Sequence, residues 1–311
     1  MRKHLVWWAL AALAGLLAVA ALASVLMGEL PTDSLRDAPE TNAVALLPRD
    51  GLAHVDSWAF AIGDGALDGH AAAVADRLGI FELVVIDAEE ATAEEIAALH
   101  SRKTLVLAYL SIGTIEPWRS WYAALKPFAL DRMSDWDEYY ADVSEPGYRR
   151  TILGIASGML DKGFDGLFVD NVDMVESHPS QVGGMRALVS ALSAQTRRRG
   201  GLLFAQNGDA FATTLTSLLD GWNREDVTFR HDSDASSYVR VPEDDHETAL
   251  ATIESMRDAG VFVTTTDYVS VSGSADESEA LGVARGIGAL PYVSDIELER
   301  IPETPFVRSA Q

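Results

Sequence analysis

The chain of 311 residues contains no cysteine. Disulfide bonds, thiolate metal sites, a cysteine nucleophile and a bacterial lipid anchor are therefore excluded, because each of them requires a thiol. Positive charge is also scarce: 24 Lys and Arg stand against 47 Asp and Glu, which gives a formal net charge of -23. Since the nucleic-acid backbone is bound by dense basic patches, we expect no nucleic-acid partner.

Several enzyme motifs are absent as well. The sequence has no H-E-x-x-H, G-x-S-x-G or Walker pattern, and the GDG at residues 63–65 lacks the spacing of a dinucleotide-binding loop. The seven histidines are scattered along the chain. We therefore expect neither a cofactor nor a metal site, and we interpret the HDSD stretch at residues 231–234 as a solvated loop.

The longest apolar run lies near the N-terminus. Basic residues at positions 2–4 precede an apolar segment without charge at residues 5–27, and ALA at 21–23 has the small-x-small form of a cleavage site. Residues 1–30 are thus interpreted either as a signal peptide or as a transmembrane anchor, for which about 20 apolar residues suffice. Both interpretations predict export, with the protein secreted or anchored to the outer face of the cytoplasmic membrane through this segment alone.

Residues 31–51 are rich in Pro, Asp and Thr and have no apolar period, which is typical of a linker. The remaining residues, 52–311, contain eight short apolar runs that alternate with helical patterns. The runs are residues 58–62, 83–87, 104–110, 166–170, 202–206, 220–225, 261–266 and 287–292, and the clearest helical patterns are residues 91–100, 148–162, 185–199 and 248–259.

These patterns predict the fold class. Apolar strands without strict alternation indicate a parallel sheet that is buried on both faces. Eight strand–helix units in about 250 residues are typical of an α/β protein with a single (β/α)8 TIM barrel. A doubly wound open sheet is the alternative. Thr92 and Glu95 have the spacing of a capping box at the start of one helix.

Polar residues follow the apolar runs at their C-terminal ends. Because these ends share one rim of a parallel barrel, we expect them to line a pocket. The residues concerned are Asp87, Ser111, Glu116, Asp170, Asn171, Asp173, Gln206, Asn207, Glu225, Asp226, Asp267 and Tyr268. For Asp87 and Asp267, a simple helix-capping role is the alternative.

Two carboxyl groups that face each other across a barrel mouth are typical of glycosidic-bond hydrolysis. Crowded carboxylates raise each other's pKa, so one can keep its proton while the other is ionised. Aromatic residues near the same rim would either stack on sugar rings or belong to the core. They are Tyr109, Trp118, Trp121 and Trp222.

Several sequence blocks resemble glycoside hydrolase family 114, the endo-α-1,4-polygalactosaminidase-like barrels. The blocks are VVIDAEE (84–90), LAYLSIGTIEPWRSWY (107–122), DWDEYYADVSEPGYRRTIL (135–153), GFDGLFVDNVD (163–173), FAQNGD (204–209), LDGWNRED (219–226) and ALPYVSD (289–295). They occur in the family's order and extend over nearly all of the chain after about residue 52. The sequence departs from the family at residues 113–116, where one acid of G-E-x-E is missing, and in the polar segment 229–245.

The resemblance implies an exported hydrolase of α-1,4-linked galactosamine polymers. It implies that Asp170 is the nucleophile and Glu225 the acid/base, by analogy and with the reverse order open. It also implies that the pocket is lined by Asp87, Tyr109, Glu116, Asn171, Asp173, Asn207, Asp267 and Tyr268.

The alternatives are a hydrolase of another α-glycan and an exported barrel that binds polysaccharide without cleaving it. A cationic amino-sugar polymer would be attracted by the acidic surface, although acidity also serves solubility. Nothing in the sequence indicates an oligomeric state.

Overall fold

The structure is a computed structural model that describes residues 49–133 and 136–308. These residues belong to one unit, which spans residues 44–311. The predicted signal peptide or anchor at residues 1–30 lies outside the described residues, as does the linker at 31–51 apart from its last three positions. Among the helices of the described part, none is both long and apolar enough to cross a membrane.

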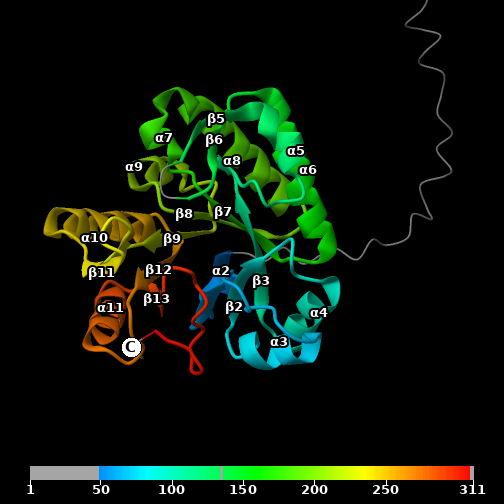
Figure 1. Ribbon diagram of the computed structural model, residues 1–311. Coiled ribbons are helices and arrows are strands. Elements are labelled where there is room, and N and C mark those ends of the chain that lie inside the picture. Colours follow the sequence, from blue (N-terminus) through cyan, green and yellow to red (C-terminus); the bar gives the residue numbers. More distant parts are fainter. Residues whose placement is uncertain (1–48, 134–135, 309–311) are drawn as a thin grey trace, which may run out of the picture. The chain divides into compact units, whose positions relative to one another are not determined.

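Eight parallel strands form the central sheet of the described chain (Figure 1). In spatial order they are β1 (Trp58–Ala61), β2 (Leu83–Asp87), β3 (Leu105–Ser111), β7 (Gly166–Asp170), β8 (Leu202–Gln206), β9 (Gly221–Glu225), β12 (Phe262–Tyr268) and β13 (Leu290–Ser294). Nearly all of their residues are buried, as expected for a parallel sheet that is covered on both faces.

The sheet nearly closes on itself. Its first and last strands are joined by the Trp58 indole N–H, which donates a 3.0 Å hydrogen bond to the Leu290 carbonyl. The Trp58 ring also packs against Tyr292 of β13, with 5.6 Å between the ring centroids. The strand order follows the chain without reversal, whereas a doubly wound sheet reverses its order at a switch point. The predicted α/β barrel is therefore confirmed.

The predicted apolar runs all fall on strands of this sheet. The last run is displaced: β13 begins at Leu290, three residues after the predicted start at Ile287. Ile287 caps helix α11, and Gly288 has a φ of 70°, a left-handed conformation that ends the helix. The apolar residues before the strand therefore belong to a turn.

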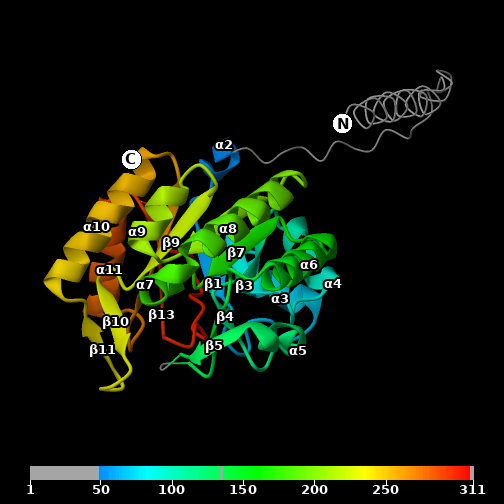
Figure 2. The same cartoon turned by 90° about the horizontal axis from the view of Figure 1, so that it is seen from above.

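Helices lie around the outside of the strands (Figure 1, Figure 2). The longer ones are α3 (Ala71–Leu78), α4 (Ala93–Ser101), α6 (Pro146–Lys162), α8 (Val182–Arg197), α10 (Glu243–Asp258) and α11 (Ala275–Gly286). Shorter helical segments are α2 (Arg49–Leu52), α5 (Tyr122–Leu125), η1 (Lys126–Phe128), α7 (Met174–Ser177), η2 (Pro179–Gln181), α9 (Asp209–Ala212) and η3 (Thr213–Leu215).

The four clearest helical patterns of the sequence correspond to α4, α6, α8 and α10, so these predictions are confirmed. At the start of α4, the Thr92 hydroxyl accepts the Glu95 backbone N–H, and the Glu95 carboxylate accepts the Thr92 backbone N–H. This reciprocal arrangement is the predicted capping box.

Two small antiparallel sheets interrupt the alternation of strands and helices. β4 (Thr114–Ile115), β5 (Ala129–Arg132) and β6 (Tyr139–Ala141) form an inserted sheet between β3 and α6. β10 (Phe229–Asp232) and β11 (Ser237–Arg240) form a hairpin between β9 and α10. The hairpin corrects the predicted solvated loop at 231–234 in part, because His231 and Asp232 end β10, whereas residues 233–236 form the exposed turn. Strands of four residues with mixed polar and apolar side chains are too short to be recognised from the sequence pattern.

Gly113 brings the inserted sheet against the end of β7. A Cβ atom at this position would lie 1.8 Å from the Asn171 carbonyl oxygen, closer than any side chain tolerates. Ile112 donates its backbone N–H to the Asp170 carbonyl at 3.1 Å, and the Gly113 carbonyl accepts the Ala141 N–H at 3.0 Å. The missing side chain therefore lets the chain after β3 pass directly over the end of β7.

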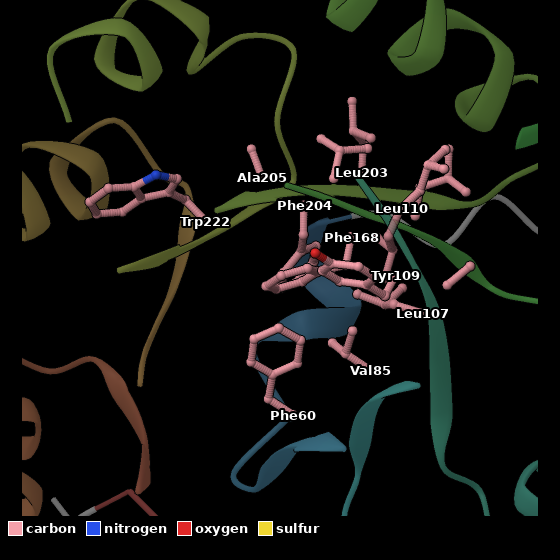
Figure 3. Packing of buried hydrophobic residues seen from close by; sticks show 14 of the residues in the cluster. Phe60, Val85, Leu107, Tyr109, Leu110, Phe168, Leu203, Phe204, Ala205 and Trp222 are labelled. Atoms are coloured by element: carbon pink, nitrogen blue, oxygen red, sulfur yellow. The ribbon is translucent and has the colours of Figure 1, made fainter. Parts of the chain in front are cut away.

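Aromatic side chains fill the barrel interior (Figure 3). The ring centroids of Phe60 and Phe168 are 5.0 Å apart, and those of Phe168 and Phe204 are 6.5 Å apart. Tyr109 packs above Phe60 at 6.1 Å. Because the interior is a packed core, reactive groups are confined to the end of the barrel.

Candidate active site

Three neighbouring strands end in polar side chains, and two of these are carboxyl groups suited to acid–base chemistry. β7 ends at Asp170, β8 at Gln206 and β9 at Glu225. The registers of β7 with β8 and of β8 with β9 place these ends side by side. They are the C-terminal ends of parallel strands, the end at which barrel enzymes build their active sites.

The residue after each of these strand ends has a left-handed backbone conformation. The φ angles are 60° at Asn171, 56° at Asn207 and 53° at Asp226. Asn and Asp adopt this region at lower cost than other side-chain-bearing residues, because their short polar groups bond locally. Each turn directs the chain away at once and leaves the preceding carboxyl or amide group at the rim.

Asp170 accepts hydrogen bonds on both of its carboxylate oxygens. The Tyr109 hydroxyl donates to Oδ2 at 2.7 Å, and the Asn171 backbone N–H donates to Oδ1 at 2.6 Å. The Gln206 side chain also lowers the pKa of Asp170. Donors of this kind favour the ionised form of a carboxyl group.

Glu225 is held by side chains from two neighbouring strands. Gln206 Nε2 and Asn207 Nδ2 donate to Oε2 at 2.8 Å and 2.7 Å, and the Tyr268 hydroxyl donates to Oε1. The orientation of the Asn207 amide is fixed, because its Oδ1 accepts the backbone N–H of Glu225 at 3.0 Å. The carboxyl group therefore has a single defined position.

The surroundings raise the pKa of both carboxyls. Burial raises the pKa of Asp170, against the hydrogen bonds from Tyr109 and the Asn171 backbone. Burial also raises the pKa of Glu225, to about 8, and here the negative charges of Asp170 and Asp226 add to the effect. Because each carboxylate makes ionisation of the other harder, the pair favours a state in which only one of the two is charged.

One amide group lies between the two carboxyls. Gln206 Nε2 donates to Glu225 Oε2 at 2.8 Å, and the Gln206 side chain also lowers the pKa of Asp170. Retaining glycosidases hold their carboxyls about 5–5.5 Å apart and inverting ones about 6.5–9.5 Å, so the separation of such a pair decides the stereochemical course.

Asp87 and Glu116, both predicted to line the pocket, share one buried cation. Arg119 Nη1 lies 2.5 Å from Asp87 Oδ2, while Nε and Nη2 lie 2.9 Å and 3.1 Å from the two oxygens of Glu116. The Arg119 side chain is 8% exposed. Asp87, Glu116 and Arg119 thus form one buried ion-pair cluster. Contact of the two carboxylates with substrate stays a prediction.

Two further predicted residues lie close to Asp170. Asn171 Nδ2 donates to the hydroxyls of Ser111 at 3.0 Å and Thr114 at 3.2 Å, which ties β7 to β3 and the inserted sheet. Burial raises the pKa of Asp173 to about 7, and the charge of Asp170 adds to the rise. Both residues thus lie at the rim that the sequence predicts.

Asp267 is not brought to the carboxyl pair. It lies on the opposite face of β12 from Tyr268, since successive strand residues point to opposite faces. Its Oδ1 accepts the backbone N–H groups of Thr228 at 2.6 Å and Phe229 at 2.7 Å. The Asp267 carboxylate therefore holds the start of the β10–β11 hairpin.

The aromatic residues near the rim differ in exposure. Trp222 is fully buried and donates its indole N–H to the Asn207 carbonyl at 2.8 Å, so it belongs to the core and not to a sugar platform. The Trp121 ring lies 5.6 Å from the Arg119 guanidinium. Trp118 is 58% exposed and remains available for stacking.

The pocket residues implied by the family resemblance do not include Arg119, Glu138 or Gln206, although Gln206 is among the strand-end residues that we expected at the rim. Burial raises the pKa of Glu138 to about 7 against a hydrogen bond from Thr114, and the charges of Glu116 and Asp170 add to the rise. Glu138 and Arg119 both lie within sequence blocks that carry the family resemblance. These blocks are the part of the sequence from which the two residues could have been identified. In the described residues, no three His, Asp or Glu side chains gather in a geometry that would hold a metal ion.

A TIM-barrel-like fold with two supported carboxyl groups at the strand ends fits the class of glycoside hydrolases. Comparison with known families gives the same class, because the sequence model of glycoside-hydrolase family GH114 matches residues 37–304. The chain belongs to this family and is thus a glycoside hydrolase.

Individual relatives share the fold at low sequence identity. An uncharacterised protein of Deinococcus radiodurans is 26% identical over 240 residues, which cover 71% of this chain and 75% of that protein. The glycoside hydrolase domain of PelA from Pseudomonas aeruginosa superposes with a TM-score of 0.67 at 23% identity, covering 79% of this chain and 96% of that domain. Ega3 from Aspergillus fumigatus, solved in complex with galactosamine, gives a TM-score of 0.61 at 18% identity, with coverages of 78% and 92%.

Proposed function

We propose that the protein cleaves α-1,4-linked galactosamine-containing polysaccharide, with Asp170 as nucleophile and Glu225 as acid/base. The observation that carries the proposal is the pair of buried carboxyls at the ends of β7 and β9, each held by side-chain donors: Tyr109 for Asp170, and Gln206 and Asn207 for Glu225. Membership of the family supports hydrolysis. The galactosamine bound to Ega3 supports the choice of sugar.

In the first step, the Asp170 carboxylate attacks the anomeric carbon while the bond from this carbon to the glycosidic oxygen breaks. Glu225 gives its proton to the departing oxygen, which leaves as a neutral hydroxyl. In the second step, the Glu225 carboxylate takes a proton from water, and the water oxygen attacks the anomeric carbon. Asp170 departs as a carboxylate, so both groups return to their starting states.

The charge of the protein supports a cationic substrate. Free galactosamine units carry ammonium groups, and a net charge of -23 attracts such a polymer at modest salt. Near Asp170, the carboxyls of Glu138 and Asp173 add acidic groups to the rim. We therefore expect hydrolysis to be faster on deacetylated polymer than on fully acetylated polymer.

Export is part of the proposal. It is supported by the basic start and the apolar segment at residues 5–27. Fractionation of a bacterial host that expresses the full chain tests it. Recovery outside the cytoplasm, either shortened or still in the membrane fraction, is expected. Recovery of the unshortened chain in the cytoplasm alone would contradict it.

The activity is tested by measuring new reducing ends on three polymers: partly deacetylated α-1,4-galactosaminan, its fully acetylated form and an uncharged α-glucan. Wild-type protein is compared with Asp170→Asn and Glu225→Gln, and Asp131→Asn is the matched control because its side chain is 69% exposed. We expect cleavage of the galactosaminans, a loss of at least about a thousandfold in the two site variants, and no change in the control.

Two outcomes would contradict the proposal. Binding of the polymer without new reducing ends would favour a polysaccharide-binding barrel. Cleavage of the glucan alone would favour a hydrolase of another α-glycan.

A further inference from the structure

A chain of buried polar side chains runs across three strands below the two carboxyls. The hydroxyls of Thr264 and Thr266 on β12 donate to Asn223 Oδ1 at 2.9 Å and 3.2 Å. Asn223 Nδ2 on β9 then donates to Gln206 Oε1 on β8 at 3.2 Å. The two threonines and Asn223 are fully buried, and Gln206 is 3% exposed.

The strand registers hold this chain in place. Gln206 pairs with Asn223 across β8 and β9, and Asn223 pairs with Thr264 across β9 and β12. Thr266 lies two residues further along β12 and therefore points to the same face. The four side chains thus stand next to one another inside the barrel, away from solvent.

The chain of hydrogen bonds has a direction. An amide group has a donor end and an acceptor end of nearly the same shape, so only its neighbours select the orientation. The two threonine hydroxyls donate to the oxygen of Asn223, the Asn223 NH2 group donates to the oxygen of Gln206, and Glu225 Oε2 accepts from the Gln206 NH2 group. The hydroxyls at one end and the carboxyl at the other thus hold both amides in one orientation, with the Gln206 NH2 group toward the carboxyls.

We propose that Asn223 is a positioning residue that orients the Gln206 amide so that its NH2 group donates to Glu225 and faces Asp170. The inference rests on the roles given to these two carboxyls under the proposed function. Asn223 contacts neither carboxyl and acts through Gln206. The threonine hydroxyls supply the donors that fix its orientation.

Other titratable side chains also face Asp170 and Glu225, and a test must leave these side chains unchanged. They come from β3, the inserted sheet, α7, the end of β9 and β12. They are Tyr109, Glu116, Glu138, Asp173, Asp226 and Tyr268. A test that changes only the threonines leaves all of them in place.

The test compares two double variants with one control. Thr264→Val with Thr266→Val removes both donors with little change in shape, and Thr264→Ser with Thr266→Ser keeps both hydroxyls. Thr265→Val is the matched control, because Thr265 lies between them on the opposite face, is fully buried, and has a hydroxyl without a partner in the described structure. Thr266→Val alone is the second variant if the double valine protein does not fold.

In the double valine variant, the buried Asn223 oxygen loses both of its donors, and the Gln206 amide is no longer held in one orientation. Because the Gln206 side chain lowers the pKa of Asp170, the loss of this orientation raises that pKa. We expect the acidic limb of kcat/KM to move upward by about one pH unit, which lowers activity about tenfold on that limb. The double serine variant and the control should keep the wild-type profile.

A second readout separates this inference from the proposed function. The carboxyl carbon of Asp170 is titrated by NMR in the full chain labelled with 13C-aspartate, and it should shift upward in the double valine variant even if no tested glycan is cleaved. An unchanged Asp170 titration in a folded double valine protein would overturn the inference. A uniform loss of activity without movement of the acidic limb would also overturn it, since such a loss indicates a merely structural role.

Discussion

The Tyr109 hydroxyl donates a 2.7 Å hydrogen bond to Oδ2 of Asp170, across the boundary between β3 and β7. This bond favours the ionised form of Asp170 and therefore lowers its pKa. Tyr109→Phe removes the donor and keeps the ring. We expect kcat/KM to fall about tenfold to a hundredfold and its acidic limb to move to higher pH.

The control for this substitution is Tyr292→Phe. Tyr292 is also buried, but its hydroxyl donates to the Arg300 carbonyl, away from the carboxyls. Its pH profile should match that of the wild type. A Tyr109→Phe profile with an unmoved acidic limb would contradict the role given to this hydrogen bond.

The raised pKa of Glu225 has a consequence for stability. Its folded pKa, about 8, exceeds its unfolded value of about 4.3, so the folded protein binds more protons between these limits. The free energy of unfolding therefore falls as pH rises from about 4 to about 8. Glu225→Gln stays neutral throughout, so its melting temperature relative to wild type should rise by a few degrees between pH 5 and pH 8.

Glu254→Gln, on the exposed side of α10, serves as control for that experiment and should follow the wild type at every pH. The two melting curves are best compared by calorimetry in buffers of equal ionic strength. A constant difference between Glu225→Gln and wild type over this pH range would mean that Glu225 titrates normally.

Arg119 neutralises two carboxylates that are themselves buried. Arg119→Met would leave Asp87 and Glu116 without a buried cation, and an uncompensated buried charge costs about 3–5 kcal/mol. Urea unfolding should show a loss of this size. Arg102→Met breaks an exposed pair with Asp76 and should cost less than about 1 kcal/mol. Equal losses in the two variants would contradict the account of the Arg119 cluster.

Gly113 has no space for a side chain. In Gly113→Ala the new Cβ would displace the Asn171 carbonyl, and the end of β7 with Asp170 would move with it. We expect a lower melting temperature and a loss of kcat of at least about a hundredfold, since small misplacements of reacting groups are costly. Gly282→Ala, on α11 with nothing within 4 Å of the added Cβ, should be neutral or slightly stabilising. Full activity in Gly113→Ala would contradict this packing argument.

The barrel could be predicted from sequence because its strands are buried on both faces and therefore form continuous apolar runs. The inserted sheet and the β10–β11 hairpin have strands of two to four residues, too short and too polar for the same signal. The turn before β13 was misplaced because apolar residues at a helix end resemble the start of a strand.

The candidate site could be predicted in outline, since the ends of parallel strands meet at one rim. The side chain that each carboxylate binds depends on contacts between residues far apart in the sequence, such as Arg119 with Asp87. The placement of Asp267 could have been corrected from sequence, because Asp267 and Tyr268 are adjacent strand residues and cannot face the same side. Gln206 meets Glu225 only through the pairing of β8 and β9, which a single sequence does not reveal.

The most direct test of the carboxyl pair uses Glu225→Gln with an α-galactosaminyl fluoride. The fluoride leaves without acid assistance, so Asp170 can still form its bond to the sugar, while the missing base slows release. Mass spectrometry of the digested protein should find one galactosaminyl group on the peptide that contains Asp170. An adduct on another residue, or inverted sugar released without any adduct, would contradict the assignment of Asp170 as nucleophile and Glu225 as acid/base.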